Sequence, residues 1–140
     1  MGRVVAKLKL TNYLDFKLRR LRRLKRAPRS TEVDALVDTG ATRLYLKPSV
    51  IRALGLDQVG EVDSQTTNGV RRRNTYDPVH LELMGRDGNF DVVEVDEDVP
   101  NLLGQIPLEH LDLVVDPKRR KLIPNPEHGD KLMTEEYRSG

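Results

Sequence analysis

Leu36-Val37-Asp38-Thr39-Gly40-Ala41-Thr42 places an acid, a small hydroxyl residue and a glycine directly after an apolar run. The preceding residues, Val33-Asp34-Ala35-Leu36-Val37, end in apolar side chains that suit a buried strand. The sequence therefore predicts a strand over residues 31–38, with Asp38 at its end. The tripeptide alone also fits an ordinary turn, because Asp, Thr and Gly are common turn residues.

A second apolar segment, Leu102-Leu103-Gly104, follows well downstream and leads into Ile106-Pro107-Leu108-Glu109-His110-Leu111. These two segments, in this order, resemble the retropepsin-type aspartic peptidases, the family of retroviral proteases and their cellular single-domain relatives. In that family an apolar-apolar-Asp-Thr/Ser-Gly-Ala strand and turn precedes an apolar-apolar-Gly segment that opens a short helix. The resemblance covers residues 4–124, and its last part, residues 111–124, looks like the ending of small prokaryotic members.

The resemblance implies an all-β fold. The expected architecture is the acid-protease β-barrel, with one short helix after the Leu-Leu-Gly segment and half of an active site in each subunit. Residues 1–124 would form this domain, with a basic insertion at 17–29. Residues 125–140 are polar and are expected to form a C-terminal tail.

The resemblance also implies an aspartic endopeptidase, whose chemistry needs two facing carboxylates that share a proton. The chain has one Asp-Thr-Gly triplet, so the active site is expected to form between two copies in a homodimer. The catalytic residues would be Asp38, Thr39 and Gly40, with the Thr39 hydroxyl reaching across the dimer. An extended substrate peptide would pair with the backbone near Ala41 and Thr42. No metal and no cofactor are implied.

Asn68-Gly69 is the strongest short hairpin signal in the chain, and it lies between predicted strands at 60–67 and 70–77. The family places its flap here, a mobile hairpin that closes over the substrate. The expected tip contributes substrate-binding residues Thr66, Thr67, Asn68, Gly69 and Val70. The alternative is a plain surface hairpin. Arg71, Arg72 and Arg73 follow; they either favour acidic substrates or, the preferred interpretation, keep an exposed strand soluble.

Two positions depart from the retroviral pattern. Retroviral members carry acids shortly after the Ala and an Arg after the late Gly, whereas this chain has Thr42-Arg43 and Gln105. Because both partners of that ion pair are absent together, a Thr42–Gln105 hydrogen bond is a hypothesis for what replaces it.

The rest of the sequence predicts short strands and helices. Residues 3–11 alternate as a strand, and residues 48–54 read as a helical turn that stops at Gly55. A second hairpin is expected from strands 79–84 and 90–95 around Arg86-Asp87-Gly88-Asn89. A helix near 107–111 and strands near 113–115 and 121–123 complete the domain.

Charge is segregated along the chain. Residues 17–29 hold eight basic residues and no acid, whereas the rest holds sixteen basic and twenty-two acidic residues. Leucines at three- and four-residue spacing indicate a short amphipathic helix here: Leu14, Leu18, Leu21 and Leu24. Contact with nucleic acid or an anionic surface is one interpretation. A solubilising insertion, or docking on the protein's own acidic surface, is the favoured one.

Length and composition limit the number of domains, the kind of core and the cellular location. A chain of 140 residues with 4% aromatic residues makes one domain with an aliphatic core. It has no cysteine, no membrane-spanning apolar run and no signal-peptide core at its start, so a soluble cytoplasmic protein is expected. Two other functions remain open: a non-catalytic peptide-binding or dimerisation module with the same fold, and a processing enzyme dedicated to its own tail or one partner.

Overall fold

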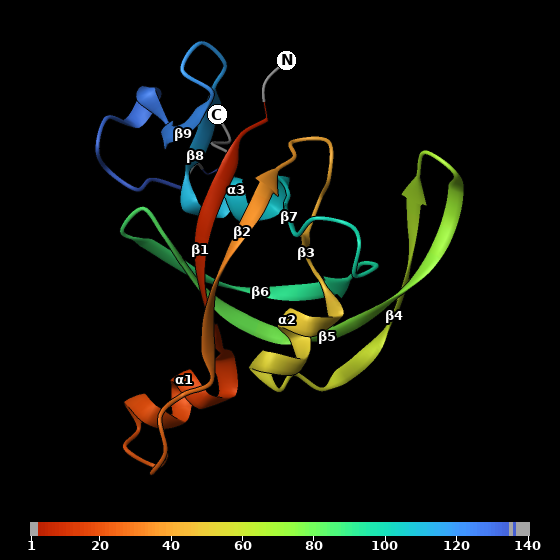
Figure 1. Cartoon of the computed structure of the whole chain (residues 1–140). Coiled ribbons are helices and arrows are strands. Elements are labelled where there is room, and N and C mark those ends of the chain that lie inside the picture. Colours follow the sequence, from red (N-terminus) through yellow and green to blue (C-terminus); the bar gives the residue numbers. More distant parts are fainter. Residues whose placement is uncertain (1–2, 135, 137–140) are drawn as a thin grey trace.

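The computed structural model describes residues 3–134 and 136, and this part of the chain is mostly β (Figure 1). The strands are β1 (Val5–Asn12), β2 (Ser30–Val37), β3 (Leu44–Leu46), β4 (Gln58–Thr66), β5 (Gly69–Leu83), β6 (Arg86–Glu94), β7 (Leu102–Leu103), β8 (Leu113–Asp116) and β9 (Lys121–Pro124). The helices are α1 (Tyr13–Arg20), α2 (Pro48–Leu54), α3 (Gln105–Leu111) and a 3₁₀ turn, η1 (Pro126–His128). The all-β class expected from the sequence is confirmed.

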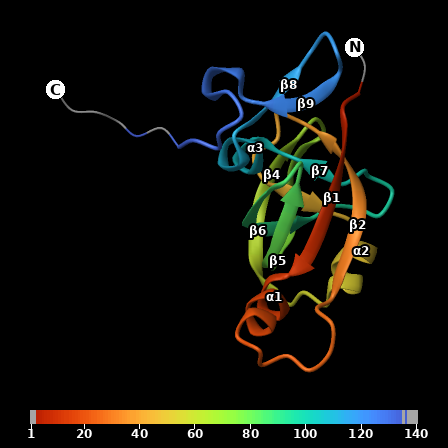
Figure 2. The ribbon, with the colours of Figure 1, turned by 90° about the vertical axis from the view of Figure 1, so that its left-hand side faces the viewer.

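The main sheet has the strand order β1-β2-β7-β3-β6-β5-β4. Strand β1 also pairs with β5, from Lys9 opposite Glu82 to Asn12 opposite Val79, so the pairing returns to its first strand. Among the strands of the described residues, β4 pairs only with β5, and it reaches away from the body as one arm of a long hairpin (Figure 1). Strands β8 and β9 form a separate two-stranded sheet at the end opposite α1 (Figure 2).

The core is aliphatic, as the composition predicts. Strand β1 shows the pattern, because Ala6, Leu8 and Leu10 are buried while the alternate positions Val5 and Lys7 face solvent. Leucines and valines from seven elements fill the interior: Leu8, Leu10, Leu44, Leu46, Leu54, Leu81, Leu103, Leu108, Leu111, Val79, Val92 and Val93 are fully buried. Ala35 of β2 and Leu103 of β7 belong to this core, so it holds the ends of the two strands that carry the motif segments.

Helix α2 has the bounds that its sequence predicts. Pro48 occupies its first turn, and Gly55 ends it in the left-handed conformation with φ 63°. A side chain is disfavoured there both by that backbone conformation and by space, since a Cβ on Gly55 would collide with the Arg29 guanidinium.

The second hairpin differs from its prediction. Strand β5 continues through Pro78 with an irregularity between Tyr76 and Val79, where a residue without an N–H is tolerated. The turn is the pair Met84-Gly85, with φ 54° and 76°, and not residues 86–89. Two consecutive positive φ values are what a tight two-residue hairpin needs, so Arg86 to Asn89 are free to pair with β5.

The amphipathic helix expected in the basic segment is also shifted. Helix α1 begins at Tyr13 and ends at Arg20, so Leu21 and Leu24 lie in the following loop. The buried residue of this helix is Asp15, whereas Leu14 is 59% exposed. Leu21 is also exposed and Leu18 and Leu24 are half-buried, so the four leucines do not form a core-facing stripe.

Part of the expected C-terminal tail is held against the end of α3. Asp112 accepts hydrogen bonds from the Asn125 side chain at 3.2 Å and the Met133 N–H at 3.3 Å, and pairs with His128 Nδ1 at 2.7 Å. Burial raises the pKa of the Asp112 carboxyl, but the contacts with His128, Asn125 and Met133 outweigh it and lower the pKa. Residues 135 and 137–140 of the expected tail lie outside the described residues.

None of the helices in the described ranges is long and apolar enough to cross a bilayer.

Candidate active site

Asp38 lies directly after β2, at a position set by β7. Strand β7 runs parallel to the end of β2, with Leu36 opposite Leu102 and Val37 opposite Leu103. The Asp38 N–H then donates to the Leu103 carbonyl at 2.9 Å. The two motif segments are therefore adjacent strands, and Asp38 is the first residue beyond their last pair.

The turn after Asp38 is held by its own hydrogen bonds. The Gly40 N–H donates to Asp38 Oδ1 at 3.0 Å, and the Ala41 N–H donates to the Asp38 carbonyl at 3.1 Å. A Cβ on Gly40 would lie 3.3 Å from Asp38 Oδ1, so glycine suits the close approach. The carboxylate is thus oriented by the backbone that follows it.

The start of α3 fixes the same turn from the other side. The N–H groups of Gly104, Gln105 and Ile106 donate to the carbonyls of Arg43, Ala41 and Thr42 at 2.9, 2.8 and 2.9 Å. The first N–H groups of a helix have no partner within the helix, so the turn supplies acceptors for them. Gly104 is required for this contact, because a Cβ there would collide with the Arg43 carbonyl and lie 2.8 Å from that of Ala41.

The hypothesis of a Thr42–Gln105 hydrogen bond is wrong. The Thr42 hydroxyl lies 3.3 Å from the Tyr45 hydroxyl, and Gln105 Nε2 donates to Glu109 at 3.1 Å along α3. The two segments are joined instead through their backbones, by the three hydrogen bonds described above. Because backbone hydrogen bonds make this link, the identities of the side chains at positions 42 and 105 could not reveal it.

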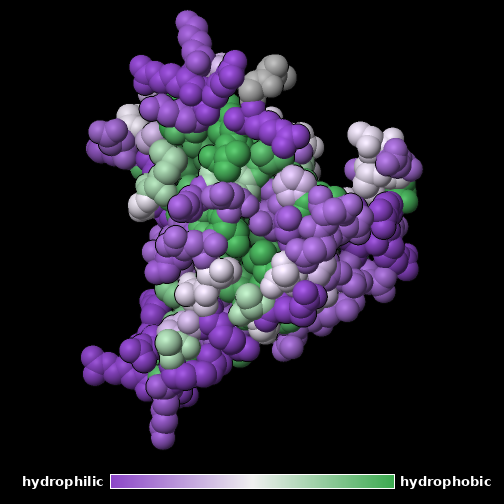
Figure 3. All heavy atoms as spheres, viewed as in Figure 1, coloured by the Kyte–Doolittle hydropathy of each residue, from purple (hydrophilic) through white to green (hydrophobic). Residues whose placement is uncertain are grey.

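A cleft of about 820 Å³ opens between the Asp38 turn and the β4–β5 hairpin. It appears in the space-filling view as a notch between the body and the raised hairpin (Figure 3). It contains six of the expected site residues, namely Asp38, Gly40, Ala41, Thr42, Thr66 and Thr67. Asn68, Gly69 and Val70 do not line it.

The hairpin turn explains that difference. Strands β4 and β5 reach Thr66 and Gly69, so the turn residues are Thr67 and Asn68, one position earlier than the sequence suggests. The Thr66 hydroxyl donates to the Gly69 carbonyl at 2.7 Å and accepts from the Asn68 N–H at 3.2 Å. Gly69 follows with φ 108°. The tip therefore presents its threonine side to the cleft.

Sequence reasoning missed several lining residues: Arg43, Tyr45, Val62, Asp63, Ser64, Gln65, Arg73, Val93, Val95, Val99 and Leu102. Arg73 differs from its two neighbours in burial, because its side chain is 12% exposed. Both Arg71 and Arg73 donate to Asp96, at 3.2 and 3.1 Å. The side chains of Arg71 and Arg72 are more than half exposed. Strand alternation was the available signal: Val62 pairs with Arg73 across the hairpin, so both side chains share one face.

Asp38 borders a second, smaller groove of about 270 Å³ on its other side. Thr39 lines this groove and is exposed, and its hydroxyl makes no hydrogen bond within the described part of the chain. The walls are mainly apolar: Val4, Leu36, Val37, Leu102 and Val115, with Arg3 at the edge. Asp38 thus stands between the larger cleft and a smaller, mainly apolar groove.

The comparisons with known proteins agree with this arrangement. Residues 29–105, more than half of the chain, match the family model described as aspartyl protease, a retropepsin-like family. The match spans both the Asp38 turn and Gly104, the two segments that the structure joins. A search of curated proteins finds no match. The chain therefore belongs to the retropepsin-like aspartyl proteases.

Proposed function

We propose that the protein is an aspartic endopeptidase whose active site forms between two copies of the chain. The observation that carries this proposal is the place of Asp38, at a hydrogen-bonded turn between a peptide-sized cleft and an apolar groove. Family membership supports peptidase activity. One chain supplies one such carboxylate, whereas the chemistry requires two.

The proposed mechanism uses water as the nucleophile. Two Asp38 carboxylates face each other across a two-fold axis and share one proton, because two like charges at close range are costly. The ionised carboxylate takes a proton from a water molecule as it attacks the peptide carbonyl carbon. The protonated carboxylate donates to the carbonyl oxygen, and a proton then passes to the leaving amine.

The surface around Thr39 supports the homodimer. Val4, Val37 and Val115 are partly buried and pack on the core, yet they also line the groove beside Thr39. Covering these side chains with a second copy removes apolar surface from water. In the proposed dimer, Thr39 of each chain finds its hydrogen-bond partner across the axis and steadies the two turns.

The β4–β5 hairpin supplies the proposed flap. Its tip, with Thr66 and Thr67 on the cleft side, faces the Asp38 turn across open space. Closure onto an extended peptide would exclude water from the reacting bond. The backbone around Ala41 and Thr42, at the floor of the same cleft, would pair with that peptide as an added strand.

The experiment that tests this function is cleavage of a peptide library, read by mass spectrometry from acid to neutral pH, with wild type and Asp38→Asn. New peptide termini should appear with wild type, and the variant should lose activity by about 10²–10⁴-fold or more. Asp38→Asn keeps the side-chain shape and an acceptor for the Gly40 N–H. Its circular dichroism and oligomeric state serve as the folding control.

The same experiment separates the alternative function. A non-catalytic peptide-binding module would give no wild-type termini, while both proteins still bound library peptides. Termini produced equally by wild type and Asp38→Asn would show a contaminating peptidase and would reject Asp38 as the catalytic group. A processing enzyme would cleave its own tail or few library members, still dependent on Asp38.

A further inference from the structure

The segment from α1 to the start of β2, residues 13–29, is a compact basic element built around one buried carboxylate. Asp15 is 1% exposed. It accepts hydrogen bonds from Arg26 Nη1 and Nη2 at 2.9 and 3.0 Å, and from Arg29 Nε and Nη2 at 2.8 and 3.1 Å. The Arg29 N–H donates to it as well, at 3.0 Å. These five contacts fold the loop back onto the helix.

The inner side of the basic element is fixed to the body. Asn12 accepts from the Asp15 N–H at 3.1 Å, and its amide donates to the Leu54 carbonyl at 2.9 Å. The Phe16 ring stacks on His80, which is buried, with centroids 3.8 Å apart. The element is therefore a formed surface and not a loose linker.

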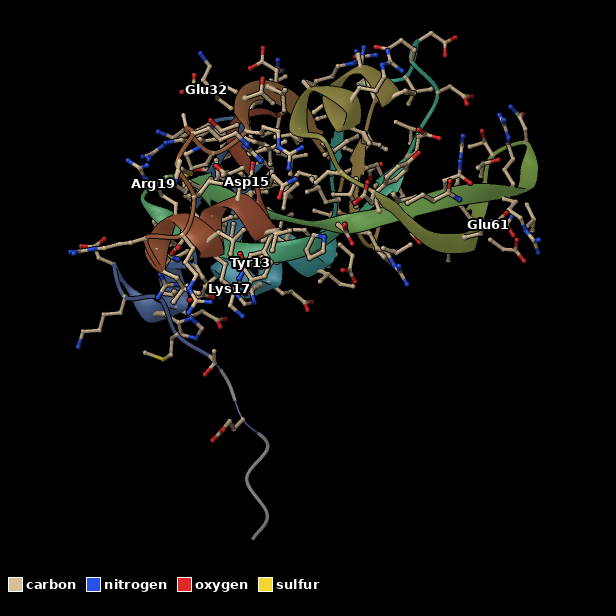
Figure 4. The ribbon with its side chains drawn as sticks, turned by 90° about the horizontal axis from the view of Figure 1, so that it is seen from below. Tyr13, Asp15, Lys17, Arg19, Glu32 and Glu61 are labelled. Carbon is tan, nitrogen blue, oxygen red and sulfur yellow. The ribbon has the colours of Figure 1, made fainter. Side chains whose placement is uncertain are left out.

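The outer side carries charge that the protein itself does not neutralise. Of its eight cations, Arg26 and Arg29 bind Asp15. The other six are exposed and make no ion pair within the described ranges: Lys17, Arg19, Arg20, Arg22, Arg23 and Lys25. Figure 4 looks onto this end, with Asp15, Lys17 and Arg19 labelled on α1. The Asp15 contacts thus hold six unpaired cations on one projecting element.

Two large apolar side chains are exposed among these cations. Leu14 is 59% exposed and Leu21 is 55% exposed. One lies in the first turn of α1 and the other directly follows its last residue, so both belong to the exposed surface of the basic element. Exposed leucines beside cations suit a surface that presents anionic headgroups and an acyl boundary together.

We propose that the basic element binds the surface of an anionic lipid bilayer and attaches the protein to it peripherally. The six unpaired cations contact lipid phosphate and carboxylate groups, and Leu14 and Leu21 insert at the headgroup boundary. Nucleic acid is disfavoured as the occupant, because phosphate contacts use cations but not leucines. The element holds two aromatic residues, Tyr13 and Phe16, and the Phe16 ring is already stacked on His80. A single remaining ring is not the row of rings on which successive bases stack.

The position of the basic element is compatible with activity at a membrane. Helix α1 lies at one end of the molecule, whereas the end of β2 and the tip of the β4–β5 hairpin lie towards the other (Figure 1). A bilayer bound at α1 therefore leaves the Asp38 cleft open. This inference does not depend on peptidase activity, and its test has a separate readout.

The test is co-sedimentation of the full chain with vesicles of phosphatidylcholine, with and without phosphatidylserine. Wild type should bind the phosphatidylserine vesicles about tenfold or more tightly than the neutral ones, with binding lost at high salt. Arg19, Arg20, Arg22 and Arg23, all changed to Gln, should remove that preference. The matched control changes four exposed cations in the β8–β9 hairpin, Lys118, Arg119, Arg120 and Lys121, to Gln and should retain it.

A third variant decides between lipid and nucleic acid. Leu14→Ser with Leu21→Ser keeps every charge and should weaken vesicle binding severalfold. The proposal is overturned if wild type binds both vesicle types equally. It is also overturned if the arginine variant and the β8–β9 control lose vesicle binding to the same extent. Unchanged binding of the leucine variant, with tight binding of single-stranded RNA by wild type, also overturns it and assigns the element to phosphate recognition. All substituted side chains are exposed, so circular dichroism should be unchanged.

Discussion

At the scale of single residues, Gly104 carries the tightest constraint near the proposed site. Its N–H donates to the Arg43 carbonyl, and a Cβ would collide with that same oxygen. Gly104→Ala should therefore destabilise the fold by about 1–3 kcal/mol, the usual cost of overpacking. Urea unfolding measures this. Gly60→Ala is the control, because a Cβ there would lie 3.3 Å from the Thr75 hydroxyl and would meet no backbone atom at closer range. An equal loss of unfolding free energy in the two variants would contradict this explanation.

Asp15 gives a residue-scale prediction about pH. Hydrogen bonds from Arg29 and then Arg26 hold the pKa of its carboxyl well below its usual range, against an opposing effect of burial. A folded-state pKa below the unfolded value of about 3.9 gives stability that is present above that pH and is lost as pH falls through the folded pKa. Wild type should therefore lose stability below about pH 4, with part of that loss absent from Asp15→Asn.

At neutral pH, Asp15→Asn should cost about 2–3 kcal/mol. This is less than for a fully buried pair, because the Arg26 and Arg29 side chains are 51% and 41% exposed and are screened by water. Thermal unfolding of both proteins across a pH series measures the two effects together. A variant that matches wild type at neutral pH would show that the five contacts to Asp15 add no net stability.

At the scale of elements, the β4–β5 hairpin should affect catalysis more than folding. Gly69 follows its tip with φ 108°, a conformation that strains any other residue by about 1–3 kcal/mol. Gly69→Ala should lower kcat/KM severalfold, because the tip can no longer settle on the substrate. Gly85→Ala, with φ 76° in the other hairpin and equally open surroundings, imposes a similar strain away from the cleft. Equal effects of the two changes on kcat/KM would reject the flap.

Element boundaries were predictable where one residue type fixes the backbone. Pro48 and Gly55 delimit α2 at the expected positions. The turn of the second hairpin was predicted at the wrong residues, because Arg86-Asp87-Gly88-Asn89 has the composition of a turn. The actual turn uses Met84 at a positive φ, which is unusual for methionine and is not predictable from its residue type. The fold of residues 13–29 was missed for another reason. It depends on Asp15 meeting two arginines that lie 11 and 14 positions later, which spacing does not predict.

At the scale of the whole molecule, the two motif segments were recognisable in the sequence, but the residues around them were not. Asp38 and Gly104 stand out because each belongs to a short motif of characteristic residue types. Arg73 and Tyr45 enter the same cleft through strand pairing and curvature, and the side-chain bond expected between Thr42 and Gln105 proved to be a backbone connection. The apolar groove beside Thr39 joins residues from both ends of the chain, Val4 and Val115, which only the folded chain brings together.

The central claim is that two Asp38 side chains from two copies of the chain form one active site. The most direct test is specific activity measured over a dilution series, with the oligomeric state followed by sedimentation in the same buffer. Specific activity should fall in parallel with the fraction of dimer, and Asp38→Asn should be inactive at every concentration. Constant specific activity through a measured dimer-to-monomer transition would contradict the claim.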